Sequence, residues 1–83
     1  MTRNDLILKI KQASRHNDKE FQEVIAAVLD GGFLRENELA QEVGTSLLTI
    51  YRWRDGINAP HPFLRPHLFK RLIKKLQETD SKQ

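Results

Sequence analysis

The sequence predicts a small all-α domain, and three observations support that prediction. Its 83 residues are the length of a single domain. The apolar residues recur at the three- and four-residue spacing of amphipathic helices, and no stretch shows the alternation of a half-buried strand. Glycine and proline mark the boundaries between these periodic segments. We therefore expect one domain over residues 1–83, built from five short helices.

The first two helices are expected at residues 4–15 and 18–29. Thr2 or Asn4 is placed to cap the first helix, and Asn17 or Asp18 to cap the second. The side chains that their spacing turns inward are Leu6, Ile7, Ile10 and Ala13, and then Phe21, Val24, Ile25 and Val28. Gly31 and Gly32 end the second helix because glycine accepts the left-handed backbone conformation.

The next two helices are shorter and are expected at residues 36–43 and 45–54. Gly44 separates them, and Gly56 ends the second of the pair. Thr45 or Ser46 caps this fourth helix, since a hydroxyl oxygen accepts a hydrogen bond from the free backbone N–H groups at a helix start. The two helices are therefore joined by a tight turn.

A proline-bearing loop at residues 57–62 leads to the last predicted helix, which starts at Phe63 or Pro66 and ends at about Leu76. Its apolar residues exceed what a short helix needs for one core face: Leu68, Phe69, Leu72, Ile73 and Leu76. This helix, or the helix at residues 4–15, is therefore a candidate dimer surface. The polar tail at residues 77–83 is expected to fray.

The composition excludes several classes of protein. The chain has no cysteine, which excludes disulfides, thiolate metal sites and thiol redox catalysis. No apolar run is long enough for a membrane span, and the first residues lack the pattern of a signal peptide. His61 and His67 have no nearby carboxylate set, and no nucleophile-and-base arrangement or phosphate loop stands out. We expect a cytoplasmic, nucleoid-associated protein that is not an enzyme and uses no metal or cofactor.

The charge is unevenly distributed along the chain. Residues 1–44 hold six basic and eight acidic side chains, a net charge of −2, whereas residues 45–76 hold seven basic side chains against Asp55 alone, a net charge of +6. Such asymmetry has two interpretations, a polyanionic partner or a solvated basic surface. Charge alone does not separate them.

The stretch at residues 36–56 is the most informative part of the sequence. Ala40 is small where two helices would cross closely, and Gly44 makes the turn four residues later. Val43, Ile50 and Trp53 are apolar and would lock the second helix onto the core. Ser46, Leu47, Leu48, Thr49, Tyr51 and Arg52 are then left on its outer or flanking faces. This is the pattern of a helix-turn-helix, whose second helix enters the DNA major groove.

The stretch LAQEVGTSLLTIYRWRDG, followed by INAPHPFL and a leucine-rich helix, resembles the phage repressor and Cro type of helix-turn-helix domain. The resemblance covers residues 19–76. It implies that the helix at 18–29 is the family's first helix and that the core domain is 18–76. The helix at 4–15 would then be an addition to that domain. It implies sequence-specific binding of double-stranded DNA by a homodimer, most simply as a transcriptional repressor or regulator. Helix 45–54 would lie in the major groove.

The resemblance also implies which residues contact DNA. Ser46, Leu47, Leu48 and Arg52 would approach base edges or the adjacent backbone, and Thr49 a phosphate or a base. Gln41 and the loop after the helix would meet phosphates. The full candidate set is Gln41, Thr45, Ser46, Leu47, Leu48, Thr49, Tyr51, Arg52, Arg54, Asn58 and His61.

The chain departs from the family pattern at Leu47 and Leu48, where many relatives carry hydrogen-bonding residues. Leucines can meet only thymine methyls or apolar surface. Two alternatives therefore stay open. The first is a protein-interaction module, antitoxin-like or an adaptor, that uses these leucines on a partner protein. The second is an architectural or recombination accessory factor, which would share all the DNA-contacting residues.

Overall fold

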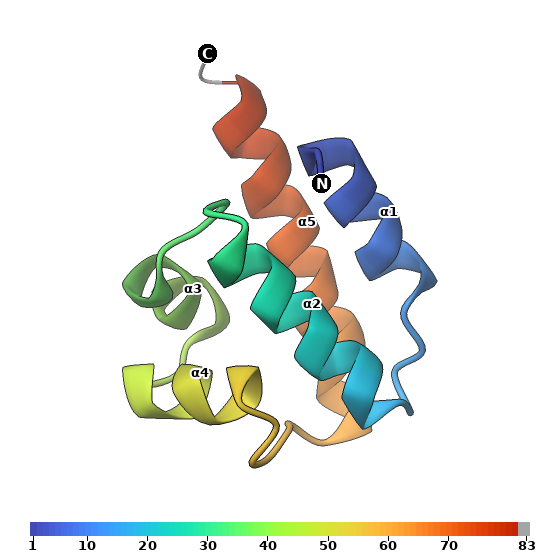
Figure 1. Ribbon diagram of the computed structural model, residues 1–83, viewed down its shortest axis with the longest axis vertical. Coiled ribbons are helices and arrows are strands. Elements are labelled where there is room, and N and C mark those ends of the chain that lie inside the picture. The colour runs from blue at the N-terminus through green and yellow to red at the C-terminus, as the bar shows by residue number, and fades with distance from the viewer. Residues whose placement is uncertain (82–83) are drawn as a thin grey trace.

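The computed structural model describes the backbone of residues 1–81 and the side chains of residues 1–78. The order of elements is α1 (Arg3–Gln12), α2 (Asp18–Asp30), α3 (Glu36–Val43), α4 (Leu47–Arg54), a single 3₁₀ turn η1 (Pro62–Leu64) and α5 (Arg65–Ser81). Figure 1 shows these helices in one domain. The described residues contain no strand, so the prediction of an all-α fold with five helices is confirmed.

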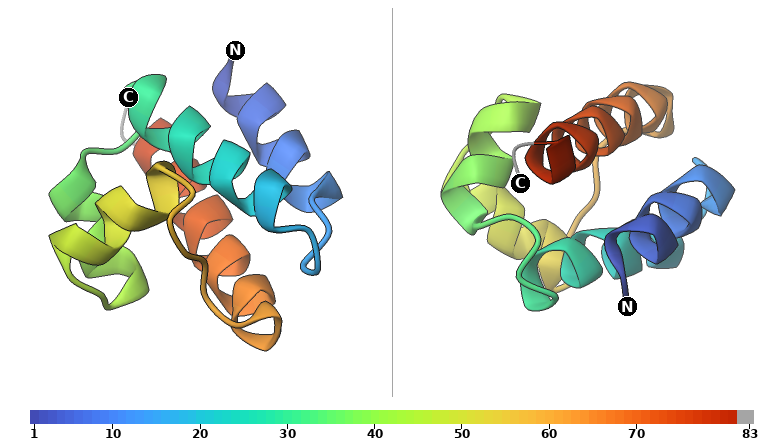
Figure 2. Two further views of the ribbon diagram at one scale, coloured as in Figure 1. Left: turned by 60° about the horizontal axis from the view of Figure 1, so that its bottom comes forward. Right: turned by 90° about the horizontal axis from the view of Figure 1, so that it is seen from above.

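The five helices form a closed ring around the core. α1 packs against α2 and α5, α2 packs against α4, α4 against α3, and α3 against α5. Figure 2 shows this ring from above, with α1 on the side opposite α3 and α4. Each helix therefore has an inner, apolar face and an outer face that is open to solvent.

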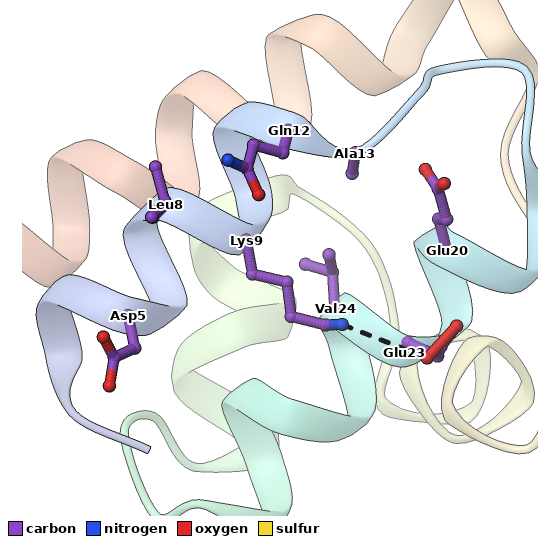
Figure 3. Close-up of a pocket in the computed structure, with 8 residues that line it drawn as sticks. All are labelled: Asp5, Leu8, Lys9, Gln12, Ala13, Glu20, Glu23 and Val24. Atoms are coloured by element: carbon purple, nitrogen blue, oxygen red, sulfur yellow. Dashed lines mark ion pairs between the residues drawn. The ribbon is translucent and has the colours of Figure 1, made fainter.

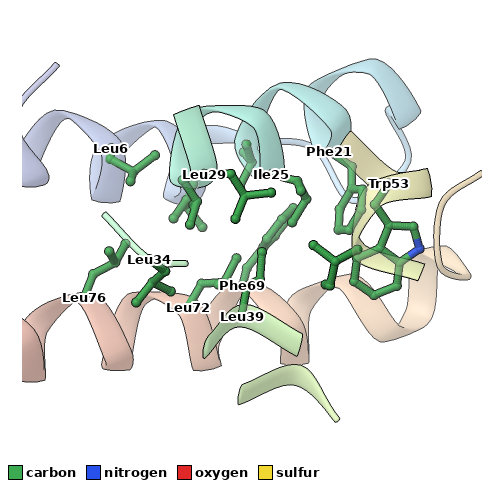
Figure 4. Packing of buried hydrophobic residues seen from close by; sticks show 14 of the residues in the cluster. Leu6, Phe21, Ile25, Leu29, Leu34, Leu39, Trp53, Phe69, Leu72 and Leu76 are labelled. Atoms are coloured by element: carbon green, nitrogen blue, oxygen red, sulfur yellow. The ribbon is translucent and has the colours of Figure 1, made fainter. Parts of the chain in front are cut away.

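The core fills the centre of the ring and joins all five helices. Phe21 is fully buried in it, with its ring edge-on to Trp53 at 5.3 Å between centroids and tilted against Phe69 at 5.8 Å. Aromatic pairs at these separations add to the stabilisation from burial alone. Figure 4 shows this packing. The other buried apolar residues are Leu6, Ile10, Val24, Ile25, Val28, Leu29, Leu34, Leu39, Ala40, Ile50, Leu72 and Leu76.

One predicted helix end in the first half was wrong, and the predicted caps were right. α1 ends at Gln12, three residues before the predicted end, because Ala13 adopts an extended backbone conformation. Thr2 caps α1 and Asn17 caps α2, in each case through a side-chain oxygen that accepts a backbone N–H. Residues 13–16 thus form the turn between the two helices.

The predictions for α4 and α5 were also wrong at one end of each helix. α4 begins at Leu47 rather than residue 45, because Ser46 is its cap. α5 continues to Ser81 rather than ending at Leu76, so most of the predicted frayed tail is helical. Leu76 is fully buried, which anchors α5 on the core just before this extra turn. Lys82 and Gln83 lie outside the described residues.

The apolar face of α5 does not provide the surplus from which a dimer surface was predicted. Phe69, Leu72 and Leu76 are 7%, 0% and 0% exposed within the single chain, while Leu68 and Ile73 are half-buried against the same core. α1 covers this side of the core with Leu6 and Ile10, which are fully buried. The N-terminal helix α1 therefore completes the core.

Candidate nucleic-acid interface

The turn between α3 and α4 is fixed by two hydrogen bonds to one carbonyl group. Gly44 has a φ of 73°, which is left-handed, and its N–H donates to the carbonyl oxygen of Ala40. The N–H of Thr45 donates to the same oxygen at 2.9 Å. A glycine accepts this φ without the steric penalty of a Cβ. Together these contacts end α3 and turn the chain into α4 within three residues.

The inner face of α4 attaches the helix to the core. Ile50 is fully buried and Trp53 is 7% exposed, as the spacing predicts. At the C-terminal end, Nε2 of Gln22 donates to the carbonyl oxygen of Arg54 at 3.1 Å, which ties the last turn of α4 to α2. The helix is thus held from both its face and its end.

The outer face of α4 carries residues spaced at i, i+1, i+4 and i+5. Leu47 and Leu48 are 44% and 56% exposed, and Tyr51 is 37% exposed. Arg52 is also exposed, one turn after Leu48 on the same face. Within the described part of the chain its guanidinium makes no hydrogen bond or ion pair. Arg52 is therefore available to an external partner.

The N-terminal end of α4 carries hydroxyl groups and no acid. The Ser46 hydroxyl accepts the N–H of Thr49 at 3.2 Å and lies 3.0 Å from the Thr49 hydroxyl. The first turns of α2 and α3 hold two acidic side chains each, whereas the first turn of α4 holds none. Because the start of a helix carries a partial positive charge, this end of α4 favours an anion.

Arg54 is already engaged within the chain, unlike Arg52. Its Nε lies 3.2 Å from Oδ1 of Asp55, and its guanidinium stacks over the Tyr51 ring at 5.1 Å from the ring centroid. It is half-buried. These contacts hold Tyr51 and Arg54 against one another, so the two side chains form one amphipathic surface at the C-terminal half of α4.

The remaining candidate residues lie around α4 rather than on its outer face. Gln41 is exposed on α3, Thr45 is half-buried in the turn, and Asn58 is exposed in the loop after α4. In that loop, Nδ1 of His61 accepts the N–H of Phe63 at 3.2 Å, and the two rings stack at 5.0 Å. His61 thus caps η1, a role that the sequence did not indicate.

Some of the basic residues that make the second half so positive are used inside the molecule. Arg65 is 2% exposed, and its guanidinium donates to the carbonyl oxygens of Pro60 at 3.0 Å and Arg15 at 2.8 Å, and to Oδ1 of Asp18 at 2.6 Å. Nη1 of Arg71 donates to the carbonyl oxygen of Glu42 at 3.2 Å. These partners are far away in sequence, so no local signal identified either residue.

A hollow of about 510 Å³ lies between α1 and α2, and Figure 3 shows the side chains around it. Its carboxylates already have partners. Asp5 accepts the N–H of Thr2, which together with the Thr2 hydroxyl lowers the pKa of Asp5. Glu20 accepts the N–H of Ser14 at 2.6 Å, and Glu23 lies 3.9 Å from Nζ of Lys9. Over the described residues no group of three histidine, aspartate or glutamate side chains is placed to hold a metal ion.

Comparisons with protein-family models, curated proteins and solved structures find no match to this chain. Among the described helices, none is both long enough and apolar enough to cross a membrane. The residues of α3, the turn and α4 are therefore the main structural evidence for a function.

Proposed function

We propose that α3, the turn and α4 form a helix-turn-helix that binds double-stranded DNA in a sequence-specific manner, with α4 in the major groove. The observation that carries the proposal is the division of α4 into two faces. Ile50 and Trp53 fix one face to the core, while Leu48 stands on the other with Arg52, which has no partner among the described residues. A recognition helix needs this combination of rigid attachment and a free reading face.

In this proposal Arg52 reads a base and the N-terminal end of α4 meets the backbone. An unpaired guanidinium can form a bidentate pair with the major-groove edge of guanine. Ser46 and Thr49 present hydroxyl groups, and the acid-free helix start suits a phosphate. Leu47 and Leu48 contact thymine methyl groups. Gln41, Thr45, Asn58 and His61 lie nearer the flanking phosphates and set the register.

The two arginines of α4 have different roles in this proposal. Arg52 reads the base, and Arg54 supports Tyr51 through the contact between guanidinium and ring. A homodimer would place two such helices about 34 Å apart, on half-sites separated by one turn of DNA. The protein would then act as a transcriptional repressor or regulator, or as an architectural factor that uses the same contacts without control of a promoter.

The test is a fluorescence anisotropy titration with a duplex selected from a random pool and with an unselected duplex. We expect tighter binding to the selected duplex, and an affinity for both that falls steeply between about 50 and 200 mM salt. Equal affinity for the two duplexes at every salt concentration would rule out sequence-specific binding. For any variant that removes a positive charge from α4, Lys11→Ala on α1, across the ring from α4 (Figure 2), serves as the charge-matched control.

A second candidate function is a protein-interaction module, and the exposure of Leu47, Leu48 and Tyr51 favours it. Three large apolar side chains on eight helical residues are more than a solvated helix needs. Selection of a duplex with the wild-type chain separates the two candidates, and the double variant Leu47→Ser, Leu48→Ser then tests the leucines. For a DNA-binding protein it weakens binding to the selected duplex, whereas for an adaptor no selected duplex exists and the wild-type chain binds all duplexes alike.

A further inference from the structure

The groove between α1 and α5 differs in charge from the hollow on the other side of α1. The groove has a volume of about 400 Å³. Lys11 and Arg15 line it from the α1 side and Lys70 from α5, and no acidic side chain lines it. The hollow between α1 and α2 is instead lined by Asp5, Glu20 and Glu23 (Figure 3). α1 thus separates an acidic flank from a basic one.

The two flanks also differ in whether their charges are already paired. The three carboxylates of the acidic flank each accept a hydrogen bond or form an ion pair within the chain. On the basic flank, Lys11 and Lys70 have no hydrogen bond or ion pair with the residues whose side chains are described. Among the described side chains, the guanidinium of Arg15 hydrogen-bonds the imidazole of His16 and lies over the ring of Phe63, and it forms no ion pair. The basic flank therefore lacks its counter-charge.

The floor of the groove is apolar, which indicates what an occupant must carry. Ile10 and Phe69 form part of the core and also line the groove, and Ala13 and Ile73 beside them are half-buried. Phosphate groups gain nothing from such a floor, whereas an apolar side chain does. An occupant that fits must combine apolar side chains with carboxylates.

We propose that this groove binds an acidic, amphipathic helical segment of a partner protein. Lys11 lies in the last turn of α1 and Arg15 in the turn that follows, so both positive charges on this wall stand at the C-terminal end of α1, where carboxylates of a helix laid along the groove would meet them. Lys70 reaches the same segment from the opposite wall. The apolar face of the segment covers Ile73 and Ala13, as in other helix-in-groove complexes.

The groove lies on the side of the molecule away from α4, and only at one end does it approach the loop after α4, where Arg15 contacts Phe63 and Phe63 stacks on His61. α1 lies across the ring from α3 and α4 in both figures that show the whole fold. The proposal does not depend on DNA binding, because the groove would bind such a segment whether or not α4 binds DNA. If both proposals hold, the groove is where a partner protein regulates or recruits the DNA-bound chain.

The test uses a fluorescein-labelled probe peptide of roughly 14 residues, about four helical turns. Leucines at every third or fourth position make one face of the peptide, and glutamates flank them. We expect measurable binding by anisotropy at low salt, and about tenfold weaker binding to Lys11→Glu, Lys70→Glu, which reverses one charge on each wall. The matched control is Lys19→Glu, Arg35→Glu, which changes net charge equally at exposed positions on α2 and before α3, outside the groove.

Four outcomes would overturn the proposal. The first is no binding at peptide concentrations up to about 1 mM. The second is equal binding of a peptide with serines in place of the leucines, which would mean charge attraction alone. The third is an equal loss of affinity in the control double variant. The fourth is binding of dodecanoate, but not of the peptide, which would mean a site for a small anionic amphiphile. Failure of DNA binding leaves all four readouts unchanged.

Discussion

Arg52 and Arg65 belong to the same strongly basic half of the chain but to different regions of the molecule. Arg65 is buried where the loop after α4 meets α2 and α5, and each of its three guanidinium nitrogens donates to an oxygen of the same chain. Arg52 stands on the outer face of α4 with no partner among the described residues. A count of basic residues therefore includes both those that stabilise the fold and those that are available to bind a partner.

The largest expected effect is a loss of folding stability on replacing Arg65, the buried arginine. Arg65→Ala should lower the free energy of unfolding by about 2–4 kcal/mol, because two carbonyl oxygens lose a charged donor and a buried side chain leaves a cavity. Urea denaturation at neutral pH measures this. The stability of Arg65→Lys should lie between that of the wild type and that of Arg65→Ala, since an ammonium group cannot reproduce the planar guanidinium that reaches three oxygens. A fully stable Arg65→Ala would show that Arg65 does not hold the loop.

Replacing Arg52, the exposed arginine, should instead reduce DNA binding and leave folding stability almost unchanged. Arg52→Ala should weaken binding to the selected duplex by about 1–3 kcal/mol, with a smaller loss on unselected DNA and a stability within about 0.5 kcal/mol of the wild type. Anisotropy titrations on both duplexes, with urea denaturation in parallel, measure these effects. An equal loss on the two duplexes would give Arg52 a phosphate contact instead of a base contact.

Much of the fold follows from local signals in the sequence. The caps at Thr2, Asn17 and Ser46 and the turn at Gly44 are chemical preferences of single residues, and the buried positions of Ile50 and Trp53 follow from helical spacing. The C-terminal helix ends that were wrong, at Gln12 and Ser81, have no glycine to mark them. Apolar spacing alone does not say at which residue such a helix stops.

The internal use of charged residues could not be predicted, because it depends on contacts between distant segments. Arg65 and Asp18 come together only when α5 and α2 pack on one core. The same holds for Arg71 and the carbonyl oxygen of Glu42. For the candidate site, the sequence placed Leu48 and Arg52 on one outer face, and the structure bears out that exposure. What that face binds stays a prediction.

The attachment of α4 can be tested apart from its outer face by comparing Gly44 and Gly56. Both have a left-handed φ, 73° and 75°, so alanine at either position should cost about 1 kcal/mol from backbone strain. At Gly44 a Cβ meets open space, whereas at Gly56 it would lie 2.8 Å from the amide of Gln22 and disturb its hydrogen bond to Arg54. Urea denaturation should show Gly56→Ala to be the less stable by about 0.5–1.5 kcal/mol.

A double-mutant cycle identifies the source of that difference. In a Gln22→Ala background the side chain that the new Cβ would meet is gone, so Gly56→Ala and Gly44→Ala should then destabilise equally. If the difference persists without Gln22, the close contact at Gly56 is not its cause. Neither alanine variant should change the ratio of affinities for selected and unselected duplexes, because neither alters the outer face of α4.

The smallest expected effect concerns Asp5, a charge that is used within its own helix. Its pKa is lowered in the folded chain because the backbone N–H and the hydroxyl of Thr2 donate to the carboxylate. A lowered folded-state pKa means that the ionised group stabilises the fold above its unfolded pKa, near 3.8, and that this stabilisation disappears as the pH falls through the folded-state value. Asp5→Asn should therefore be less stable than the wild type at neutral pH, and the two should converge in acid. Urea midpoints of both proteins, measured from pH 7 down to about pH 2, test this. A difference in midpoint that stays constant across that range would mean that the carboxylate charge contributes nothing to the cap.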